Sequence, residues 1–219
     1  MQQQDILDRY RRLREIGNRH HQAALDHLAQ PTIMERAKHL GLTHHGSFTT
    51  DSDEEMTLAF DLAVHTARRG RSRAIDRYAK AVTCADPDEA RVLDAIRNAR
   101  FSLWRIVRRH DVAGLVVEDV LRERETWMID EALTASVAPG QAFAGRLCWP
   151  DEFAIICGVV VPISAELIEE ALLEAGYWAE DRPLRDIADD PRLAVAIYRT
   201  AVVQRTMESV RFRPIGATG

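Results

Sequence analysis

Apolar and small residues in the first thirty positions recur in steps of three and four, the spacing of one helix face. Pro31 ends this pattern, so we predict one long helix from Asp5 to Gln30. The stripe begins at Ile6 and continues with Tyr10, Leu13, Gly17, His20, Ala24 and His27. Such a helix, about 39 Å long, exceeds one face of a small domain. We therefore expect the residues from Tyr10 to His27 in this stripe to form the interface of a homodimer.

Further helices are indicated by capping residues at their starts and by breakers at their ends. Asp86 before Pro87 is a clear start signal, and Ser164 and the pair Asp190-Pro191 are others. The helices predicted in this way cover residues 32–40, 52–69, 72–82, 86–98, 165–176 and 191–210. Residues 42–50, rich in Thr, His and Gly, are expected to form a loop.

The hydrophobic pattern changes between Phe101 and Pro162, where short apolar runs alternate with turn signals. The runs are SLWRIV, GLVVEDV, ETWMID, QAFAGRLCW and FAIICGVVVPI. We interpret them as five strands of one antiparallel unit, a small barrel or sandwich with no helix longer than a turn. The residues expected to fill its interior are Leu103, Ile106, Val116, Met128, Phe143, Leu147, Ile155 and Val159.

The elements together predict an α+β protein with three regions along the chain. A helical region covers residues 1–100, and an antiparallel β module covers residues 101–163. Two C-terminal helices and a tail, residues 164–219, are expected to pack back on the module.

Charge and composition exclude several classes of protein. The chain has 219 residues and a formal net charge of −5, so it is not a globally basic nucleic-acid binder. Residues 1–112 carry 19 basic and 16 acidic side chains, so an anion site is expected in this half. No apolar run is long enough for a membrane helix and the N-terminus lacks a signal-peptide core, which favours the cytoplasm and no membrane partner. The three scattered cysteines favour the same reducing compartment.

Two arginine clusters make nucleic acid the strongest specific ligand. Arginines next to aromatic residues on a small β unit can hold single-stranded RNA or DNA by phosphate contact and base stacking. The residues that would form such a face are Arg68, Arg69, Arg71, Arg73, Arg77, Trp104, Arg105, Arg108 and Arg109. The competing interpretation is a solvated surface with internal ion pairs. A further aromatic residue, Trp149, precedes Pro150 at a turn and is expected to be partly exposed.

Catalytic and cofactor motifs give little support to an enzyme. No nucleophile elbow, phosphate-binding glycine loop or paired-cysteine motif occurs in the sequence. Asp61 and His65 are four residues apart on a predicted helix and could share a metal ion, but the sequence places no third ligand near them. We therefore predict no catalytic residues, no cofactor and no tightly bound metal, and keep a metal-dependent enzyme as the weakest alternative.

The central region resembles uncharacterised bacterial proteins in which a helical region precedes a small β module. The resemblance covers roughly residues 57–163 and depends on short motifs. These are Phe60-Asp61, Gly70-Arg71-Ser72, Ser102-Leu103-Trp104, Asp119-Val120-Leu121, Pro139-Gly140 and Ala144-Gly145-Arg146. Such proteins often carry a C-terminal SEC-C zinc motif, whose Cys/His cluster is absent here. The resemblance implies the fold but no activity.

These observations favour a non-enzymatic protein-interaction or adaptor module that binds another protein. RNA or single-stranded DNA binding through the arginine and aromatic residues is the alternative, and a metal-dependent enzyme is the weaker one.

Overall fold

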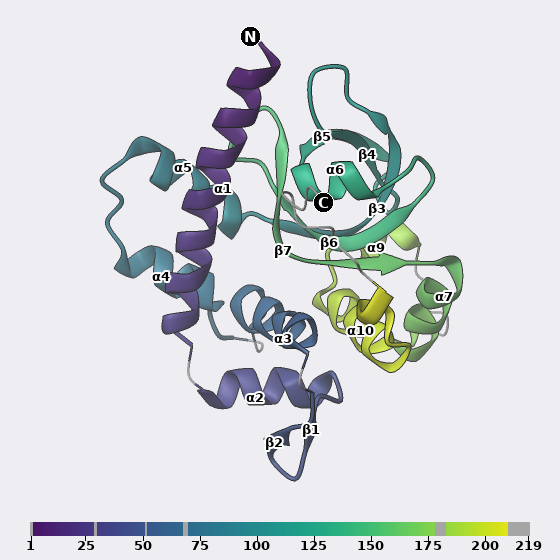
Figure 1. The fold of residues 1–219 in the computed structure, drawn as a ribbon. Helices are drawn as coiled ribbons and strands as arrows, with labels where there is room; N and C mark the ends of the chain where they lie inside the picture. Colours follow the sequence, from purple (N-terminus) through teal and green to yellow (C-terminus); the bar gives the residue numbers. More distant parts are fainter. Residues whose placement is uncertain (1, 29, 51, 68–69, 178–182, 210–219) are drawn as a thin grey trace, which may run out of the picture.

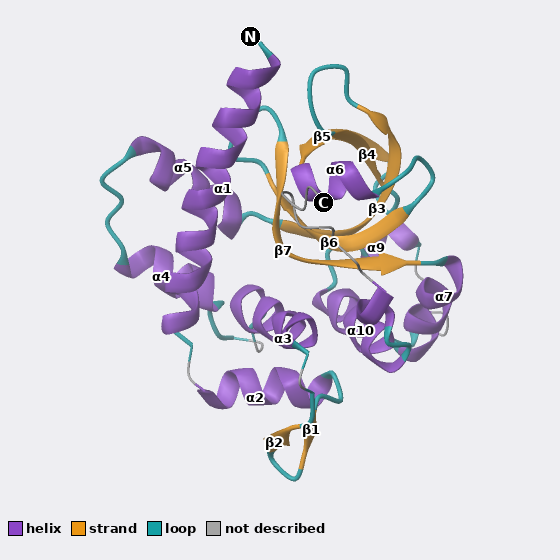
Figure 2. Ribbon diagram, viewed as in Figure 1, coloured by secondary structure: helices purple, strands orange, loops and turns teal. Residues whose placement is uncertain are grey.

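The computed structural model describes residues 2–28, 30–50, 52–67, 70–177 and 183–209. It has the mixed α and β content that the sequence predicts, with helices before and after a central group of strands. Helices α1, α4 and α5 lie on one side of the sheet, while α7 and α10 lie below it (Figures 1 and 2). The described part of the chain contains no helix with the length and apolar character needed to cross a membrane.

The N-terminal region is helical, as predicted, and its longest helix packs on the chain's own helices. The elements are α1 (Gln3–Asp26), α2 (Gln30–His39), α3 (Asp53–His65), α4 (Ala74–Ala81) and α5 (Pro87–Arg97). Helix α1 contacts both α4 and α5. The segment predicted as a loop contains a small hairpin of β1 (Thr43–His44) and β2 (Ser47–Phe48).

The predicted capping residues begin their helices. The Ser52 side chain accepts a hydrogen bond from the Glu55 backbone N–H at the start of α3. Asp86 accepts one from Asp88 at the start of α5, with Pro87 in the first turn. These bonds satisfy amide groups that the helix itself leaves without acceptors.

All five predicted strands are present, with ends that differ from the predicted ones by one or two residues. They are β3 (Arg100–Arg109), β4 (Leu115–Asp119), β5 (Arg124–Ile129), β6 (Ala142–Cys148) and β7 (Ala154–Ile163). The strand order is β3-β4-β5-β7-β6, and β6 also pairs with β3. The sheet is strongly curved (Figure 2).

The expectation of a purely antiparallel unit is wrong at one position. Strands β5 and β7 run parallel and meet along only two residue pairs, Met128 with Ala154 and Ile129 with Ile155. The five strands therefore do not form a regular antiparallel barrel. After β5 the chain crosses to form β6 beside β3. It then turns back as β7, which pairs with β6 on one edge and with β5 on the other, and so runs in the same direction as β5.

The expectation that this region contains no helix longer than a turn is also wrong. Helix α6 (Glu131–Ser136) follows β5, and the Asp130 side chain caps it by accepting a hydrogen bond from the Leu133 backbone N–H. Leu133 is buried in the interior of the sheet. Asp130-Glu131 is the same kind of start signal that predicts α5, so this helix could have been predicted from the sequence.

The C-terminal region contains α7 (Ala165–Glu174), α9 (Leu184–Ile187), α10 (Pro191–Val203) and the 3-10 helix η1 (Thr206–Ser209). Ser164 and Asp190 cap α7 and α10 as predicted. Helix α10 ends at Val203, seven residues before the predicted end near Val210, which lies outside the described residues.

Three clusters of buried apolar residues hold these elements together. One lies inside the curved sheet, a second joins the sheet to α1, α4 and α5, and a third joins it to α2, α3, α7 and α10. Ile106, Met128, Phe143 and Leu147 fill the interior as predicted. Leu103, Ile155 and Val159 instead face the helices, because strands covered on both faces lack the alternation that distinguishes inside from outside. Val116 is buried outside these clusters.

Candidate functional site

The structure does not bring the two predicted arginine clusters together. Arg71 and Arg77 are exposed at the start of α4, and Arg73 forms an ion pair with Asp76 at 2.7 Å. Arg68 and Arg69 lie outside the described residues. Helix α4 packs with α1, α3 and α5 (Figure 1), whereas the second cluster lies on the second half of β3.

The second cluster does not form an aromatic face either. Arg105 is paired with Glu118 on the neighbouring strand, while Arg108 and Arg109 are exposed at the end of β3. Trp104 is only 1% exposed, and its indole N–H donates to the Gly145 carbonyl oxygen at 3.0 Å. A buried side chain cannot offer its ring face to a base, so Trp104 is a core residue.

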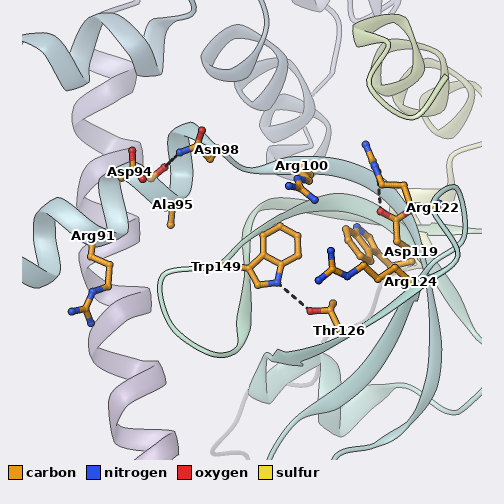
Figure 3. Close-up of a pocket in the computed structure, with 11 residues that line it drawn as sticks. Arg91, Asp94, Ala95, Asn98, Arg100, Asp119, Arg122, Arg124, Thr126 and Trp149 are labelled. Atoms are coloured by element: carbon orange, nitrogen blue, oxygen red, sulfur yellow. Dashed lines mark hydrogen bonds and ion pairs between the residues drawn. The ribbon is translucent and has the colours of Figure 1, made fainter. Parts of the chain in front are cut away.

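A different set of arginines does converge, together with Trp149, around a cleft of about 440 Å³. The cleft lies between the second half of α5 and the ends of β3, β4, β5 and β6 (Figure 3). We name it the Arg–Trp cleft and define it by the residues that line it: Arg91, Asp94, Ala95, Asn98, Arg100, Trp104, Asp119, Arg122, Arg124, Thr126 and Trp149.

Trp149 is the central aromatic group of the Arg–Trp cleft, and its indole is fixed in place. Its Nε1–H donates to the Thr126 hydroxyl at 3.1 Å (Figure 3). The buried Trp104 ring supports it with a centroid distance of 6.3 Å. Trp149 is half-buried, as expected for a tryptophan before a turn proline. An indole held in this way is a ready surface on which a planar group can stack.

Two guanidinium groups beside Trp149 carry uncompensated charge. The Arg100 guanidinium carbon lies 5.6 Å from the centre of the indole ring. Arg124 points toward Trp149 from β5 (Figure 3). Neither arginine has a carboxylate partner among the described residues. Both are exposed at the rim, so their charge is available to an anion from solvent.

The other charges of the cleft have structural roles. Buried Asp119 accepts hydrogen bonds from the Ser102 hydroxyl, the Leu121 backbone N–H and the Arg122 guanidinium. Burial lowers the pKa of Arg122, but its hydrogen bonds to Asp119 and Asp189 outweigh that effect and raise the pKa overall. Arg122 is therefore neutralised by the chain itself, and the anion-binding capacity lies with Arg100 and Arg124.

Asp61 and His65, the pair considered for a metal, are both buried on α3 but are used differently. Both Asp61 oxygens lie within 3.0 Å of the Arg146 Nε, and Asp61 Oδ2 also accepts the Tyr198 hydroxyl. The His65 ring nitrogens have no hydrogen-bond partner within the described part of the chain. In the part of the chain that the structure describes, no three His, Cys, Asp or Glu side chains gather as metal ligands would.

The stripe expected at a dimer interface faces the chain's own interior. Tyr10, Leu13 and Ala24 are at most 3% exposed and belong to the cluster that joins α1 to α4 and α5. Gly17 lies opposite α5, where an added Cβ would meet Val92 at 3.7 Å.

The two histidines of this stripe also have intramolecular partners. The His20 ring contacts the Tyr78 hydroxyl at 2.9 Å, and the exposed His27 packs edge-on against the same tyrosine. Most of the stripe is therefore covered by α4 and α5 of the same chain, while His27 remains exposed.

Comparison with known proteins gives one match. Residues 4–176 match a family of unknown function, DUF7986. This match extends beyond residues 57–163, the part of the chain for which the sequence analysis found a resemblance. No curated protein and no solved structure matches the chain.

Proposed function

The chain belongs to this family of unknown function, and from that premise we propose that it binds single-stranded nucleic acid in the Arg–Trp cleft. The observation that carries the proposal is the fixed indole of Trp149 between two unpaired arginines, Arg100 and Arg124. In this proposal one base stacks on Trp149 and the flanking phosphates contact the two guanidinium groups.

The geometry fits that chemistry on three counts. Proteins that bind single strands commonly pair an aromatic stacking surface with basic side chains that follow the backbone. The cleft, of about 440 Å³, falls within the range of small-ligand sites. Four arginines and two aspartates line it, which gives a local charge of +2 in a chain whose net charge is −5. A local patch can attract phosphate within a Debye length although the whole chain is acidic.

A protein-interaction or adaptor role is the second candidate, and an apolar groove supports it. The groove has a volume of about 720 Å³ and lies between α6, α7 and strands β3, β6 and β7. Val120, which lines it, is one of the larger exposed apolar side chains. An apolar groove can take many partners, whereas the Arg–Trp cleft specifies phosphate and a planar ring. We therefore place nucleic-acid binding first.

The test is fluorescence anisotropy with labelled twelve-nucleotide single strands of RNA and DNA and with a duplex of the same sequence. Trp149→Ala is expected to weaken single-strand binding by about 1–3 kcal/mol, or roughly 5- to 150-fold. Arg100→Ala and Arg124→Ala should each lower the slope of log affinity against log salt by about 0.7. The duplex should bind more weakly, because its bases are not free to stack.

The matched control is Arg109→Ala, since Arg100 and Arg109 are the first and last residues of the same strand and both are exposed. Only Arg100 lines the cleft, so Arg109→Ala should leave affinity almost unchanged. Circular dichroism confirms that each variant is folded. Wild-type protein that fails to bind either single strand at low salt would rule out the proposal, as would a folded Trp149→Ala variant with wild-type affinity.

A further inference from the structure

A second cavity, separate from the Arg–Trp cleft, lies between helices α2, α3 and α4. It has a volume of about 340 Å³. Its polar lining comes mainly from two places in the chain: helix α2 and the connection that leads from α3 into α4. We call it the α2–α4 cavity, and its polar lining residues used below are Thr32, Glu35, Arg36, Arg71, Ser72 and Arg77.

Arg36 is the unusual residue of the α2–α4 cavity. It is only 8% exposed, and its Nε is buried without a hydrogen-bond partner among the residues that the structure describes. No described carboxylate forms an ion pair with it. Burying a guanidinium costs several kcal/mol unless a counter-charge or hydrogen bonds offset the loss of water. A guanidinium whose Nε is buried beside a cavity with no acceptor among the described residues is therefore a sign that an anion completes the site.

The start of α4 offers a second anion-attracting feature to the same cavity. Ala74, the first residue of α4, lines the cavity, and no side chain caps the first turn of this eight-residue helix. Its first backbone N–H groups therefore have no acceptor within the helix. Such groups bind phosphate and sulfate where a basic side chain stands beside them.

Two exposed arginines at the rim add to this charge. Arg71 precedes α4, and Arg77 Nη1 donates to the Ser72 carbonyl oxygen at 2.6 Å, which holds its guanidinium near the rim. Together with Arg36 they place three guanidinium groups around one cavity.

Two acidic residues oppose this charge and limit it. Glu35 is the one carboxylate among the described lining residues, so the lining carries a charge of +2. Asp76 lies in the first turn of α4, but it is engaged by Arg73 at 2.7 Å and by Arg97 at 3.5 Å. The balance still favours an anion, and a small, doubly charged one most of all.

We propose that the α2–α4 cavity binds a phosphate group, held by the Arg36 guanidinium and the free N–H groups at the start of α4, with Arg71 and Arg77 at the rim. The site is independent of nucleic-acid binding in the Arg–Trp cleft. The phosphate is either free inorganic phosphate or the terminal group of a larger phosphate monoester, because both present the same oxygens to the cavity.

The test measures binding of inorganic phosphate to the full chain by isothermal titration calorimetry, in chloride buffers of constant ionic strength. Wild-type protein should bind about one phosphate, and its melting temperature should rise with phosphate but not with chloride. Arg36→Met keeps much of the side-chain length and removes the charge, so it should weaken binding at least tenfold. Arg109→Ala, an exposed arginine at the end of β3 that lines neither cavity, is the matched control and should bind phosphate like the wild type.

Two further variants keep the proposal testable if Arg36→Met does not fold. Arg71→Ala changes an exposed side chain and should weaken binding by a smaller factor. Glu35→Gln removes the carboxylate from the lining and should tighten binding. Absence of phosphate binding by the wild type, or unchanged binding in both folded arginine variants, would overturn the proposal.

A competition experiment distinguishes the two sources of phosphate. Phenyl phosphate that displaces inorganic phosphate at similar concentration indicates that the site accepts the end of a larger molecule. Displacement by inorganic phosphate alone indicates a site for the free ion.

Discussion

Arg146 on β6 and Asp61 on α3 form a buried ion pair, in which the arginine Nε lies 2.9 and 3.0 Å from the two carboxylate oxygens. The side chains are 8% and 1% exposed. Tyr198 on α10 donates its hydroxyl to the same carboxylate at 3.0 Å, so the group joins three elements that are far apart in sequence. Burial lowers the pKa of Arg146, but the charge of Asp61 raises it further, so the arginine stays charged in the core.

We expect Asp61→Asn to destabilise the fold by about 3–5 kcal/mol, because it leaves the Arg146 charge buried without its counter-ion. Urea denaturation followed by circular dichroism measures the change in the free energy of unfolding. Asp189→Asn is the control: Asp189 also pairs with an arginine, but its side chain is 89% exposed. That variant should change stability by no more than about 1 kcal/mol. Equal losses in the two variants would show that burial does not decide the effect.

Acid should destabilise the protein through its buried histidines. Burial, and then the charge of Arg146, lower the pKa of His65 well below its usual value of 6.5, and burial also lowers the pKa of His20. The folded state therefore binds fewer protons at these rings than the unfolded chain does below pH 6.5. The free energy of unfolding should fall as pH decreases from 6.5, by up to about 1.4 kcal/mol per pH unit for each group.

His65→Leu tests this expectation, because it removes a ring whose two nitrogens have no partner. The slope of stability against pH between 6.5 and 5 should become shallower than in the wild type. His44→Gln, in the exposed β1–β2 hairpin, should leave the slope as it is. A slope that does not change in His65→Leu would assign the acid sensitivity to other groups.

Gly17→Ala should stabilise the protein by about 0.5–1 kcal/mol, since alanine is the better helix former. The added methyl group would lie 3.7 Å from Val92 and 3.8 Å from Ile96, which is ordinary contact. Gly114→Ala is the contrasting variant: its φ is +77°, and a Cβ there would lie 2.3 Å from the Met128 carbonyl oxygen. Thermal melts should move in opposite directions. A loss of stability in Gly17→Ala would mean that α1 and α5 pack more closely than the structure shows.

The three thiols should differ in reactivity. Burial raises the pKa of Cys157 well above its usual value, and Cys148 is also fully covered, whereas Cys84 is only half-buried. N-ethylmaleimide followed by mass spectrometry should therefore modify Cys84 first, slowly because burial raises its pKa too. Cys148 and Cys157 should react only in denaturant. Labelling of Cys157 in the native protein at a rate similar to Cys84 would contradict the buried position of β7.

Local signals in the sequence predicted elements well because capping is local chemistry. Asp86, Ser164 and Asp190 each accept a backbone N–H two or three residues later, so a window of four residues is sufficient to find those helix starts. The strands were found because short apolar runs stand between turn residues. The long helix was also predicted, and its stripe is buried, but α4 and α5 of the same chain cover most of it: a stripe shows that a face is covered without showing what covers it.

The candidate site depends on contacts that no local pattern contains. Arg100 and Arg124 begin β3 and β5, and Trp149 follows the end of β6; they meet only because these three strand termini lie beside one cleft. The predicted face selected Trp104 by its closeness to arginines in the sequence, yet along β3 that side chain points inward. Likewise Asp61 and Arg146 are 85 residues apart, and the sequence offered only His65 as a neighbour.

The two-pair join between β5 and β7 has a consequence for the order in which the protein assembles. Each other strand pair is antiparallel and can extend residue by residue from its first contacts, whereas β5 and β7 can meet only after β6 has placed β7. The join should therefore form last and open first. The amide proton of Ile129 should accordingly exchange with solvent sooner than those of Trp104 and Phe143, which pair within the β3–β6 ladder.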